Sequence, residues 1–287
     1  MSIRILRRSE LTAPEIESLN RAMAAFYAQT PSSYYEIAGR AAGQYSPAQQ
    51  PFHMHLLEQV RPGMSVLEMG CGTAHLCPHV ENRGGIYTGI DHSPDLLRAN
   101  SSRFPQARFL PVGAMLERQF DLVASLYTIE HVVDPPAYLQ AMWSACRPGG
   151  LLAVICPEFI ECEGFPQSVF YGTTARRLRE KIQSFALADA LRHALEVKWL
   201  APRWKAAARQ SPPGAFWINT RPAVLHGGAY SIDADAVHLS TLRDLVWWFE
   251  SHSATIVTSS KSLPGVPPAV LRFNCYLLAR KPHSDPR

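Results

Sequence analysis

A glycine-rich turn and a later aspartate are the residues of this chain whose types and spacing best suit ligand binding. Gly70 and Gly72 follow the apolar run Val66–Met69, and Asp91 ends a second apolar run that begins at Ile86. Glycines at the end of a strand let the backbone approach a ligand and open the next helix. A carboxylate at the tip of the next strand can accept a hydrogen bond from each hydroxyl of a ribose. These residues therefore predict a site for an adenosine-type cofactor.

The spacing of the glycines argues against two phosphate-binding motifs. A dinucleotide fingerprint needs a third glycine three residues after the second, and His75 stands at that position. The Gly-Lys-Ser/Thr run of a phosphate loop does not occur in the sequence. Glu68, beside the turn, would repel a pyrophosphate but could face a cationic or ammonium-bearing ligand. S-adenosyl-L-methionine (SAM) has a sulfonium and an ammonium group and no phosphate.

Three segments resemble the class I SAM-dependent methyltransferases. The glycine turn LEMGCGTA at 67–74, the run FDLVASLYTIEHVVDP at 120–135 and the basic-Pro-Gly-Gly turn at 147–150 occur in the order that this family shows. Together with Asp91 they cover about residues 64–157. Because independent elements agree, the resemblance implies the fold of the family as well as its cofactor, SAM, with S-adenosyl-L-homocysteine as the product.

The elements around these segments predict an α/β fold. Alternating strand and helix patterns indicate parallel strands, and the short runs at 254–258 and 271–279 add a final antiparallel hairpin. The resemblance implies a seven-stranded, mostly parallel, doubly wound sheet with an antiparallel last strand. We expect residues 1–62 to form an N-terminal helical cap, and 63–157 with 238–282 to form the SAM-binding core.

Residues 158–237 form an insertion between the fifth strand and the last helix. A connection of this kind usually has about 2–6 residues, so some 80 residues need a structure of their own. Residues 173–197 have helical periodicity, and the insertion as a whole is expected to be mainly helical. Since ligands of open α/β sheets bind beyond the carboxyl ends of the strands, we interpret the insertion as a lid over the acceptor. A packing element, or an interface for a homodimer, is the alternative.

The resemblance also assigns cofactor contacts residue by residue. The strand at 107–112 ends beside the adenine, where Ala114 and Met115 are the expected contacts, and Asp91 with His92 lies at the ribose. The segment after the fourth strand runs along the methionine end. The expected cofactor-binding residues are Glu68, Gly70, Cys71, Gly72, Asp91, His92, Ala114, Met115, Ser125, Leu126 and Tyr127.

Methyl transfer from a sulfonium is an in-line displacement, so the protein mainly aligns the reacting atoms. A hydroxyl acceptor must also lose a proton, and His131, just past the fourth strand, is the candidate base; a structural role in its loop is the alternative. Relatives with Glu-x-x-Glu-His bind a divalent metal there. Tyr127 replaces the first glutamate here, so we expect no catalytic metal. Candidates on the acceptor side are Trp199, Trp217, His226, Tyr230, Asp233, Asp235 and His238.

Composition sets wider limits. The 287 residues are 47% hydrophobic and include six scattered cysteines without zinc-ligand spacing, which favours free thiols in the cytoplasm. No apolar run is long enough to predict a membrane span. The net charge of +4 permits but does not imply nucleic-acid binding, and the Asn/Asp-Pro-Pro-aromatic motif of nucleic-acid amine methyltransferases is missing, so we do not expect a nucleic-acid acceptor.

These observations predict a cytoplasmic methyltransferase that modifies a small molecule or a glycan-type metabolite, with O-methylation as the first hypothesis. N- or C-methylation of a specialised metabolite is a second hypothesis, and methylation of RNA or protein is a third. A SAM-binding regulatory subunit without catalysis is the hypothesis from a different class of function.

Overall fold

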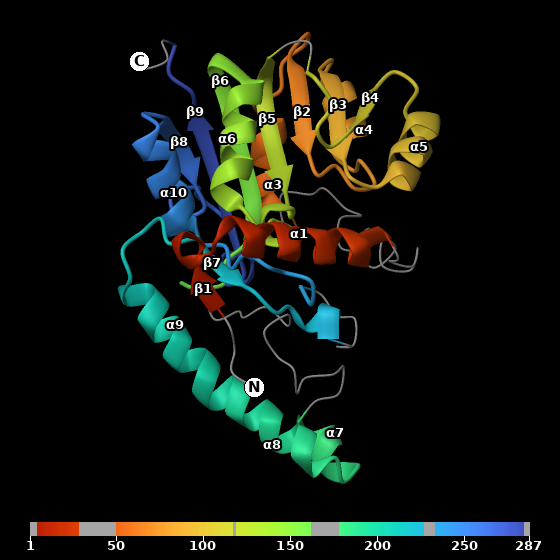
Figure 1. Ribbon diagram of the computed structural model, residues 1–287. Coiled ribbons are helices and arrows are strands. Elements are labelled where there is room, and N and C mark those ends of the chain that lie inside the picture. Colours follow the sequence, from red (N-terminus) through yellow and green to blue (C-terminus); the bar gives the residue numbers. More distant parts are fainter. Residues whose placement is uncertain (1–4, 29–49, 117–118, 162–177, 227–232, 284–287) are drawn as a thin grey trace.

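A seven-stranded sheet forms the centre of the protein, which is described over residues 5–28, 50–116, 119–161, 178–226 and 233–283 of the computed structural model (Figure 1). Its strands lie in the order β4, β3, β2, β5, β6, β9, β8, and all pairs are parallel except those that β9 makes with β6 and β8. The predicted fold is thereby confirmed. The strands are β2 (Ser65–Met69), β3 (Ile86–Asp91), β4 (Arg108–Pro111), β5 (Phe120–Leu126), β6 (Cys146–Pro157), β8 (Thr255–Ser259) and β9 (Asn274–Arg280).

Helices cover both faces of the sheet because its central strands are apolar on both sides. Leu67 and Val123 pack with α6 and α10 on one face, whereas Val66 and Leu122 pack with α3 and α4 on the other. Figure 1 shows α6 and α10 in front of the sheet and α3 behind it. The covering helices are α3 (Pro51–Leu57), α4 (Cys77–Glu81), α5 (Pro94–Arg103), α6 (Pro135–Ala145), α10 (Leu242–Ser251) and α11 (Pro268–Leu271).

Local side-chain caps start two of these helices. The Ser93 hydroxyl accepts a hydrogen bond from the backbone N–H of Leu96 at the start of α5 (3.3 Å), and Pro94 occupies the first helical position. The Asp134 carboxylate does the same for Ala137 in α6. Such caps satisfy backbone donors that the first helical turn leaves without partners, so the position of each helix start follows from local sequence.

A small cover lies at the carboxyl ends of the parallel strands. It contains β1 (Ile5–Arg7), η1 (Arg8–Glu10), α1 (Ala13–Ala28), β7 (Trp217–Asn219) and η5 (Ala223–His226), and β1 pairs antiparallel with β7. Apolar residues of α1, such as Leu19 and Met23, pack with Val133, Ile218 and Val237. The N-terminal segment and the insertion therefore share one small sheet and one core. The short strand β1 was not predicted, because the segment was expected to be helical.

A helical arm extends away from the sheet (Figure 1). It is made of α7 (Leu178–Gln183), α8 (Leu187–Leu195), a π turn (Glu196–Leu200, η4) and α9 (Ala201–Gln210). The predicted helix over 173–197 therefore continues to Gln210, while residues 173–177 lie outside the described part. Pro202, beyond the predicted end at 197, occupies the second position of α9, where a missing N–H is tolerated.

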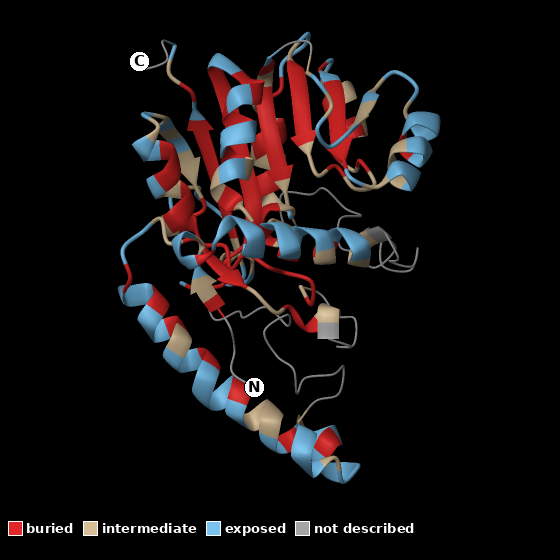
Figure 2. Ribbon diagram, in the orientation of Figure 1, coloured by how far each residue is buried: buried red, intermediate tan, exposed pale blue. Residues whose placement is uncertain are grey.

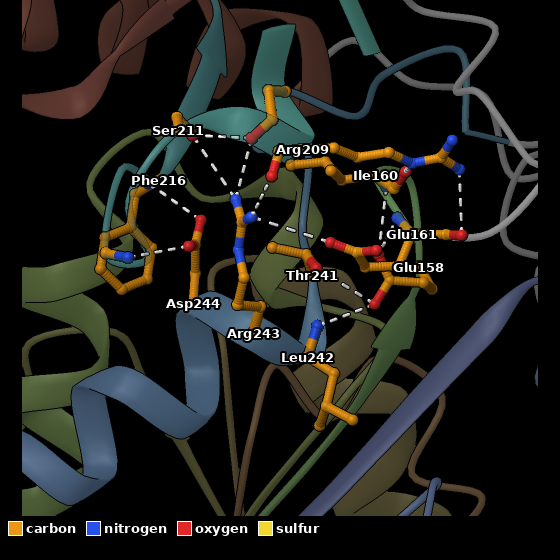
Figure 3. Close-up of polar contacts among 12 residues, drawn as sticks. Glu158, Ile160, Glu161, Arg209, Ser211, Phe216, Thr241, Leu242, Arg243 and Asp244 are labelled. Atoms are coloured by element: carbon orange, nitrogen blue, oxygen red, sulfur yellow. Dashed lines mark hydrogen bonds and ion pairs between the residues drawn. The ribbon is translucent and has the colours of Figure 1, made fainter. Parts of the chain in front are cut away.

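Buried carboxylates attach the insertion to the core (Figure 3). Glu158, at the end of β6, is 3% exposed and accepts backbone hydrogen bonds from Ile160 (3.1 Å), Glu161 (3.0 Å) and Leu242 (2.8 Å). Thr241 donates a further bond from its hydroxyl (3.2 Å). One side chain therefore fixes both the start of the insertion and the start of α10, where a negative charge is favourable.

The end of the arm is held by a second set of contacts in the same view (Figure 3). The Arg243 guanidinium donates to the backbone oxygens of Ala208 (2.9 Å) and Arg209 (2.8 Å), which belong to the last turn of α9. The Asp244 carboxylate accepts from the backbone N–H groups of Gly214 (2.8 Å) and Phe216 (3.1 Å). The last turn of α9 and the return of the chain are therefore tied to α10.

We expect Glu158→Ala to lower the free energy of unfolding by about 3 kcal/mol, because several buried donors lose a charged acceptor. Urea unfolding followed by circular dichroism measures the change. Glu161→Ala is the matched control, since the Glu161 side chain is 34% exposed and lies 3.8 Å from Arg243. Equal stability of the Glu158→Ala variant and the wild type would show that this carboxylate does not hold the insertion.

Candidate functional site

The turn after β2 depends on a glycine that has no room for a side chain. Gly70 has φ +77°, and a Cβ there would overlap the side chain of Thr128. Its backbone N–H donates to the Ile90 oxygen at the end of β3 (2.8 Å). Thr128 in turn donates from its hydroxyl to the Gly70 oxygen (3.2 Å). The ends of β2, β3 and β5 therefore meet at Gly70, and any side chain at this position would separate them.

Gly72 and Asp91 form the open part of the turn. The Gly72 N–H donates to Asp91 Oδ2 (2.8 Å), and the Ser93 N–H donates to Oδ1 (2.9 Å). Each carboxylate oxygen keeps acceptor capacity for a further donor such as a ribose hydroxyl. Gly72 has φ +48°, and the direction of its missing Cβ is open, with no described atom within 4 Å. Buried Asn100 donates to the Gly72 oxygen (2.7 Å) and holds the turn from beneath.

His92 links this turn to the cover. Its Nδ1 atom lies 3.4 Å from Asp91 Oδ1, and its ring makes an edge contact with Tyr27 of α1 at a centroid distance of 5.0 Å. The Tyr27 hydroxyl donates to Asp235 Oδ2 (2.9 Å). Tyr27 therefore connects the predicted ribose end of the site to the insertion. The sequence placed Tyr27 on an apolar helix face and did not identify it as a site residue.

Glu68 lies beneath the turn instead of on its open side. The residue is 5% exposed, and its carboxyl group accepts a hydrogen bond from the Tyr87 hydroxyl. Burial raises the pKa of Glu68 to about 8, against the smaller opposing effect of the Tyr87 hydrogen bond. A buried carboxyl group with a raised pKa is less suited to supply the negative charge that we expected to face an ammonium group. The contact of Glu68 with the cofactor stays a prediction.

Cys71 packs under the same turn. It is 5% exposed, and its sulfur fills the space beside Gly89. Burial, with the nearby Glu68 and Asp91 carboxyl groups, raises the pKa of its thiol far above the usual range. The thiol therefore stays protonated, and a nucleophilic role for Cys71 is not supported.

The end of β5 presents the next set of predicted residues. Ser125 is buried, and its Oγ lies 3.0 Å from the Tyr138 hydroxyl, which is also 2.9 Å from the Met69 oxygen; Leu126 is half-buried. Tyr127 has φ +52°, an uncommon conformation for a bulky residue. This conformation stacks its ring on buried His53 with a centroid distance of 5.8 Å.

The expected adenine contacts follow β4. The Ala114 N–H donates to the Pro111 oxygen (3.1 Å) in a short turn, and the Met115 side chain is 88% exposed. Neither residue reaches another predicted site residue through the described contacts. Their role in adenine binding stays a prediction.

His131 lies in a short 3₁₀ turn, η2 (Ile129–His131), among acidic side chains. Its Nδ1 atom is 3.5 Å from Asp235 Oδ2, and its Nε2 atom is 3.8 Å from Glu130 Oε1. The His131 side chain keeps 21% of its surface exposed, whereas those of Glu130 and Asp235 are 2% exposed. The structure therefore brings His131 and Asp235 together from positions 104 residues apart in the sequence.

Charges around His131 favour its protonated form. Burial lowers the pKa of this imidazole, but Asp235, Glu130 and Asp233 together outweigh burial, and the net shift of the pKa is upward. Burial also raises the pKa of Glu130 well above its usual value, so a neutral Glu130 contributes less charge than its position suggests. Asp235 is the largest single cause of the upward shift of His131. Sequence analysis ranked Asp235 low and did not identify Glu130.

The acceptor-side candidates do not all meet at this site. His238 is fully buried, with Nδ1 3.2 Å from the Ile129 oxygen, and burial lowers its pKa to about 4. Trp217 is buried against Trp204, with ring centroids 5.5 Å apart. Trp199 is 58% exposed on the arm. His238 and Trp217 are therefore packed in the protein interior, whereas Trp199 lies on the outer surface of the arm.

The remaining acceptor-side candidates have different positions. Asp233 is half-buried, and burial raises its pKa in spite of the nearby His131. Tyr230 lies outside the described residues, as does the side chain of His226. Over the described ranges, no group of three or more His, Cys, Asp or Glu side chains could hold a metal ion. Within the same ranges, no helix is both long enough and apolar enough to cross a membrane.

A comparison with protein families identifies the fold and the turn. A family model described as a methyltransferase domain matches residues 43–203, which is more than half of the chain. The chain belongs to the methyltransferase domain family. It is a class I SAM-dependent methyltransferase, and its cofactor is S-adenosyl-L-methionine.

Curated relatives match a smaller part of this methyltransferase. It is 31% identical over 96 residues to a ubiquinone biosynthesis O-methyltransferase of Methylobacterium nodulans, a match that covers 31% of this chain and 39% of the relative. It is 34% identical over 101 residues to a trans-aconitate 2-methyltransferase of Deinococcus radiodurans, a match that covers 34% of this chain and 39% of the relative. The chain therefore spans about two fifths of the length of these relatives.

Solved structures match the methyltransferase over most of its length. A 1,6-didemethyltoxoflavin-N1-methyltransferase of Burkholderia thailandensis, with S-adenosylhomocysteine bound, has a TM-score of 0.53 and 18% identity. The match covers 95% of this chain and 92% of that one. A SAM-dependent methyltransferase of Mesorhizobium loti has a TM-score of 0.50 and 13% identity, covering 84% and 100%. At these identities the likeness concerns the fold.

The described residues of the turn fit a SAM molecule. The open space over Gly72 accommodates a ligand close to the backbone, and Asp91 has acceptor capacity beside it. Bound SAM supplies a methyl group activated by a sulfonium. The assignment of individual contacts to Gly72, Asp91 and His92 stays a prediction.

We expect Asp91→Ala to weaken binding of S-adenosylhomocysteine roughly 10- to 100-fold, because charged hydrogen bonds to ribose contribute about 1.5–3 kcal/mol. Isothermal titration calorimetry measures the affinity. Asp95→Ala is the matched control, since the Asp95 side chain is 86% exposed four residues away and pairs with Arg98. Unchanged affinity of the Asp91→Ala variant would rule out the ribose assignment.

The raised pKa of Glu68 predicts a dependence of stability on pH. Its stabilising contribution is full below the unfolded pKa of 4.5 and falls as the pH rises to about 8, because the unfolded state loses its proton first. Each unit of pKa shift corresponds to about 1.4 kcal/mol. Relative to the wild type, Glu68→Gln should therefore gain stability between pH values of about 5 and about 8.

Urea unfolding of both proteins at the two pH values measures the difference that is due to Glu68. Glu17→Gln, at an exposed position of α1, is the control for a change of charge alone. A stability difference that does not change with pH would mean that Glu68 is ionised in the folded protein. It could then act as an anion under the turn.

Proposed function

We propose that this methyltransferase transfers a methyl group from SAM to a hydroxyl of a small-molecule acceptor, with His131 as the general base. The observation that carries the proposal is the contact of His131 with Asp235 near the end of β5, with the imidazole still 21% exposed. A hydroxyl becomes a good nucleophile when a nearby base takes its proton. The partial matches to ubiquinone biosynthesis O-methyltransferases agree with this acceptor class.

The two ring nitrogens of His131 have different surroundings, from which we infer which nitrogen carries the ring proton and which accepts a proton. Nδ1 is buried and faces Asp235 Oδ2, so we place the ring proton on Nδ1. The second nitrogen, Nε2, then accepts the proton of the acceptor hydroxyl. Asp235 stabilises the imidazolium that results, and the Tyr27 hydroxyl holds the Asp235 carboxylate in place.

The cover formed by α1 and the insertion provides the walls of the acceptor site in this proposal. Tyr27 comes from α1, Asp235 comes from the returning end of the insertion, and both lie at the carboxyl edge of the sheet. We propose the division into an N-terminal cap (1–62), a core (63–157 and 238–282) and an inserted acceptor subdomain (158–237).

His131→Asn should lower the rate of methyl transfer about 100-fold or more while cofactor affinity stays unchanged, because a general base contributes to the reaction step. The rate is measured with labelled SAM and a metabolite extract, and the affinity with S-adenosylhomocysteine. His79→Asn, at a half-buried position of α4 away from η2, is the control. Full activity of the His131→Asn variant would leave His131 a structural residue of its loop.

The same pair predicts a pH profile. Only neutral His131 accepts a proton, so activity should rise with pH through the pKa of His131, which lies above 6.5. Asp235→Asn removes the main cause of the upward shift and should move this inflection to lower pH. Proton NMR of the His131 ring gives the same pKa without an acceptor. Asp95→Asn should leave it unchanged, and an unaltered pKa in Asp235→Asn would contradict the pairing.

A further inference from the structure

The helical arm has an unusual outer surface. Of the fifteen large apolar side chains that are exposed among the described residues, eight lie between positions 182 and 200. Helices that pack on one side normally have polar residues on the other. Here the buried positions are the mixed ones, with three alanines and three charged residues, whereas the exposed positions include most of the large apolar side chains; the buried residues are Lys181, Ala190, Glu196, Ala201, Lys205 and Ala208. The outer apolar residues are Ile182, Phe185, Leu187, Leu191, Leu195, Val197, Trp199 and Leu200.

Four of these residues form a continuous stripe. Leu187, Leu191, Leu195 and Trp199 follow one another at intervals of four residues and are 48–64% exposed. Intervals of four keep side chains on neighbouring turns of one helix face. Figure 2 shows exposed residues along the outer side of this arm, away from the sheet. The stripe is therefore a linear surface and not a set of scattered contacts.

Basic residues accompany the stripe. Positions 190–210 contain five basic residues, Arg192, Lys198, Arg203, Lys205 and Arg209, and one acidic residue, Glu196. Of these, Lys205 is buried and Arg209 donates to the backbone oxygens of Ile160 (2.8 Å) and Glu161 (3.0 Å), so Lys198 and Arg203 are the exposed cations nearest to the stripe. Glu196 is buried and pairs with Arg192 (3.1 Å).

An exposed cation lies directly beside the apolar stripe. The Arg203 guanidinium is 4.5 Å from the centroid of the Trp199 ring. Tryptophan and arginine next to each other are typical of helices at a membrane surface, where the ring lies at the headgroup level and the cation meets lipid phosphates. Lys198, one residue before Trp199, is also exposed.

We propose that the arm, residues 178–210, binds the surface of an anionic lipid bilayer with the stripe Leu187, Leu191, Leu195 and Trp199 at the acyl boundary. Exposed apolar area supplies the insertion, and the excess of basic residues supplies the attraction to acidic headgroups. This is a peripheral contact along one helix face. The arm is fixed to the core at its end by Arg243, so the enzyme stays attached as one body (Figure 3).

A second copy of the chain fits this surface less well. Two arms packed against each other would bring two segments with four excess positive charges each into contact. Like charges at close range repel, and beside Trp199 the exposed charged residues Lys198 and Arg203 are both basic, whereas the exposed acids Glu180 and Asp189 precede Leu191. Charge complementarity therefore favours an anionic surface over a symmetric dimer.

Vesicle flotation with the full chain tests the proposal. The vesicles consist of phosphatidylcholine alone or of phosphatidylcholine with a minor fraction of phosphatidylglycerol. We expect at least about tenfold stronger binding to the mixed vesicles, because each basic residue near an anionic surface strengthens binding about fivefold. Added salt should weaken this binding.

The double variant Leu191→Gln/Leu195→Gln should reduce binding to the mixed vesicles about tenfold or more, because two apolar side chains no longer favour insertion. Val257→Gln is the control, since Val257 is 43% exposed on β8. Circular dichroism and affinity for S-adenosylhomocysteine should be unchanged in both variants, which establishes that they fold.

Several outcomes would overturn the proposal. These are no binding to mixed vesicles, equal binding to both kinds of vesicle, and equal binding of the folded double variant and the wild type. Light scattering tests whether a second copy of the chain binds the stripe instead. A dimer that is lost in the double variant, without vesicle binding by the wild type, would assign the stripe to a second copy.

Discussion

The candidate active site depends on the hydrogen bonds that the backbone oxygen of Glu130 accepts. It accepts hydrogen bonds from the N–H groups of Val237 (2.7 Å) and His238 (2.8 Å), which join the return of the insertion to the loop after β5. Backbone bonds of this kind are fixed in direction, so they set the register of the returning chain against η2. Asp235, two residues before Val237, thereby reaches His131. Without this junction the two side chains would belong to unrelated segments.

The cover also couples the donor side of the enzyme to the acceptor side. The ring of Tyr27 makes an edge contact with His92, which follows Asp91, the predicted ribose ligand, and the Tyr27 hydroxyl donates to Asp235. The ring of Tyr27 also lies 6.3 Å from that of His131. A movement of α1 therefore affects both the cofactor turn and the proposed base. This arrangement explains why an N-terminal helix, far from the glycine turn in sequence, belongs to the site.

Sequence predicts the fold well and locates the glycine turn, because the determinants of both are local; the contacts of the turn with the cofactor stay a prediction. Gly70, Gly72 and Asp91 lie within one βαβ unit, and the family motifs follow strand by strand. The pair of His131 and Asp235 depends on an insertion whose return path no periodicity reveals. Glu68 shows a different limit, since its position in the motif is plain but its burial against Tyr87, and hence its raised pKa, arises only from packing. The extension of the arm to Gln210 was not predicted, because the apolar periodicity was followed only to Val197.

The insertion combines two surfaces with opposite requirements. Its returning end, near Asp235, is buried and polar, as proton transfer from an acceptor needs a site screened from water. Its arm presents apolar side chains to solvent at a cost in solubility that a small-molecule enzyme does not need for catalysis. Binding to a lipid surface would explain these exposed side chains, because a bilayer concentrates amphiphilic acceptors in the layer where the arm would lie. Glu158 binds the start of the insertion to α10, and Arg243 binds the end of the arm to the same helix, so the proposed membrane contact and the acceptor side of the enzyme share this support.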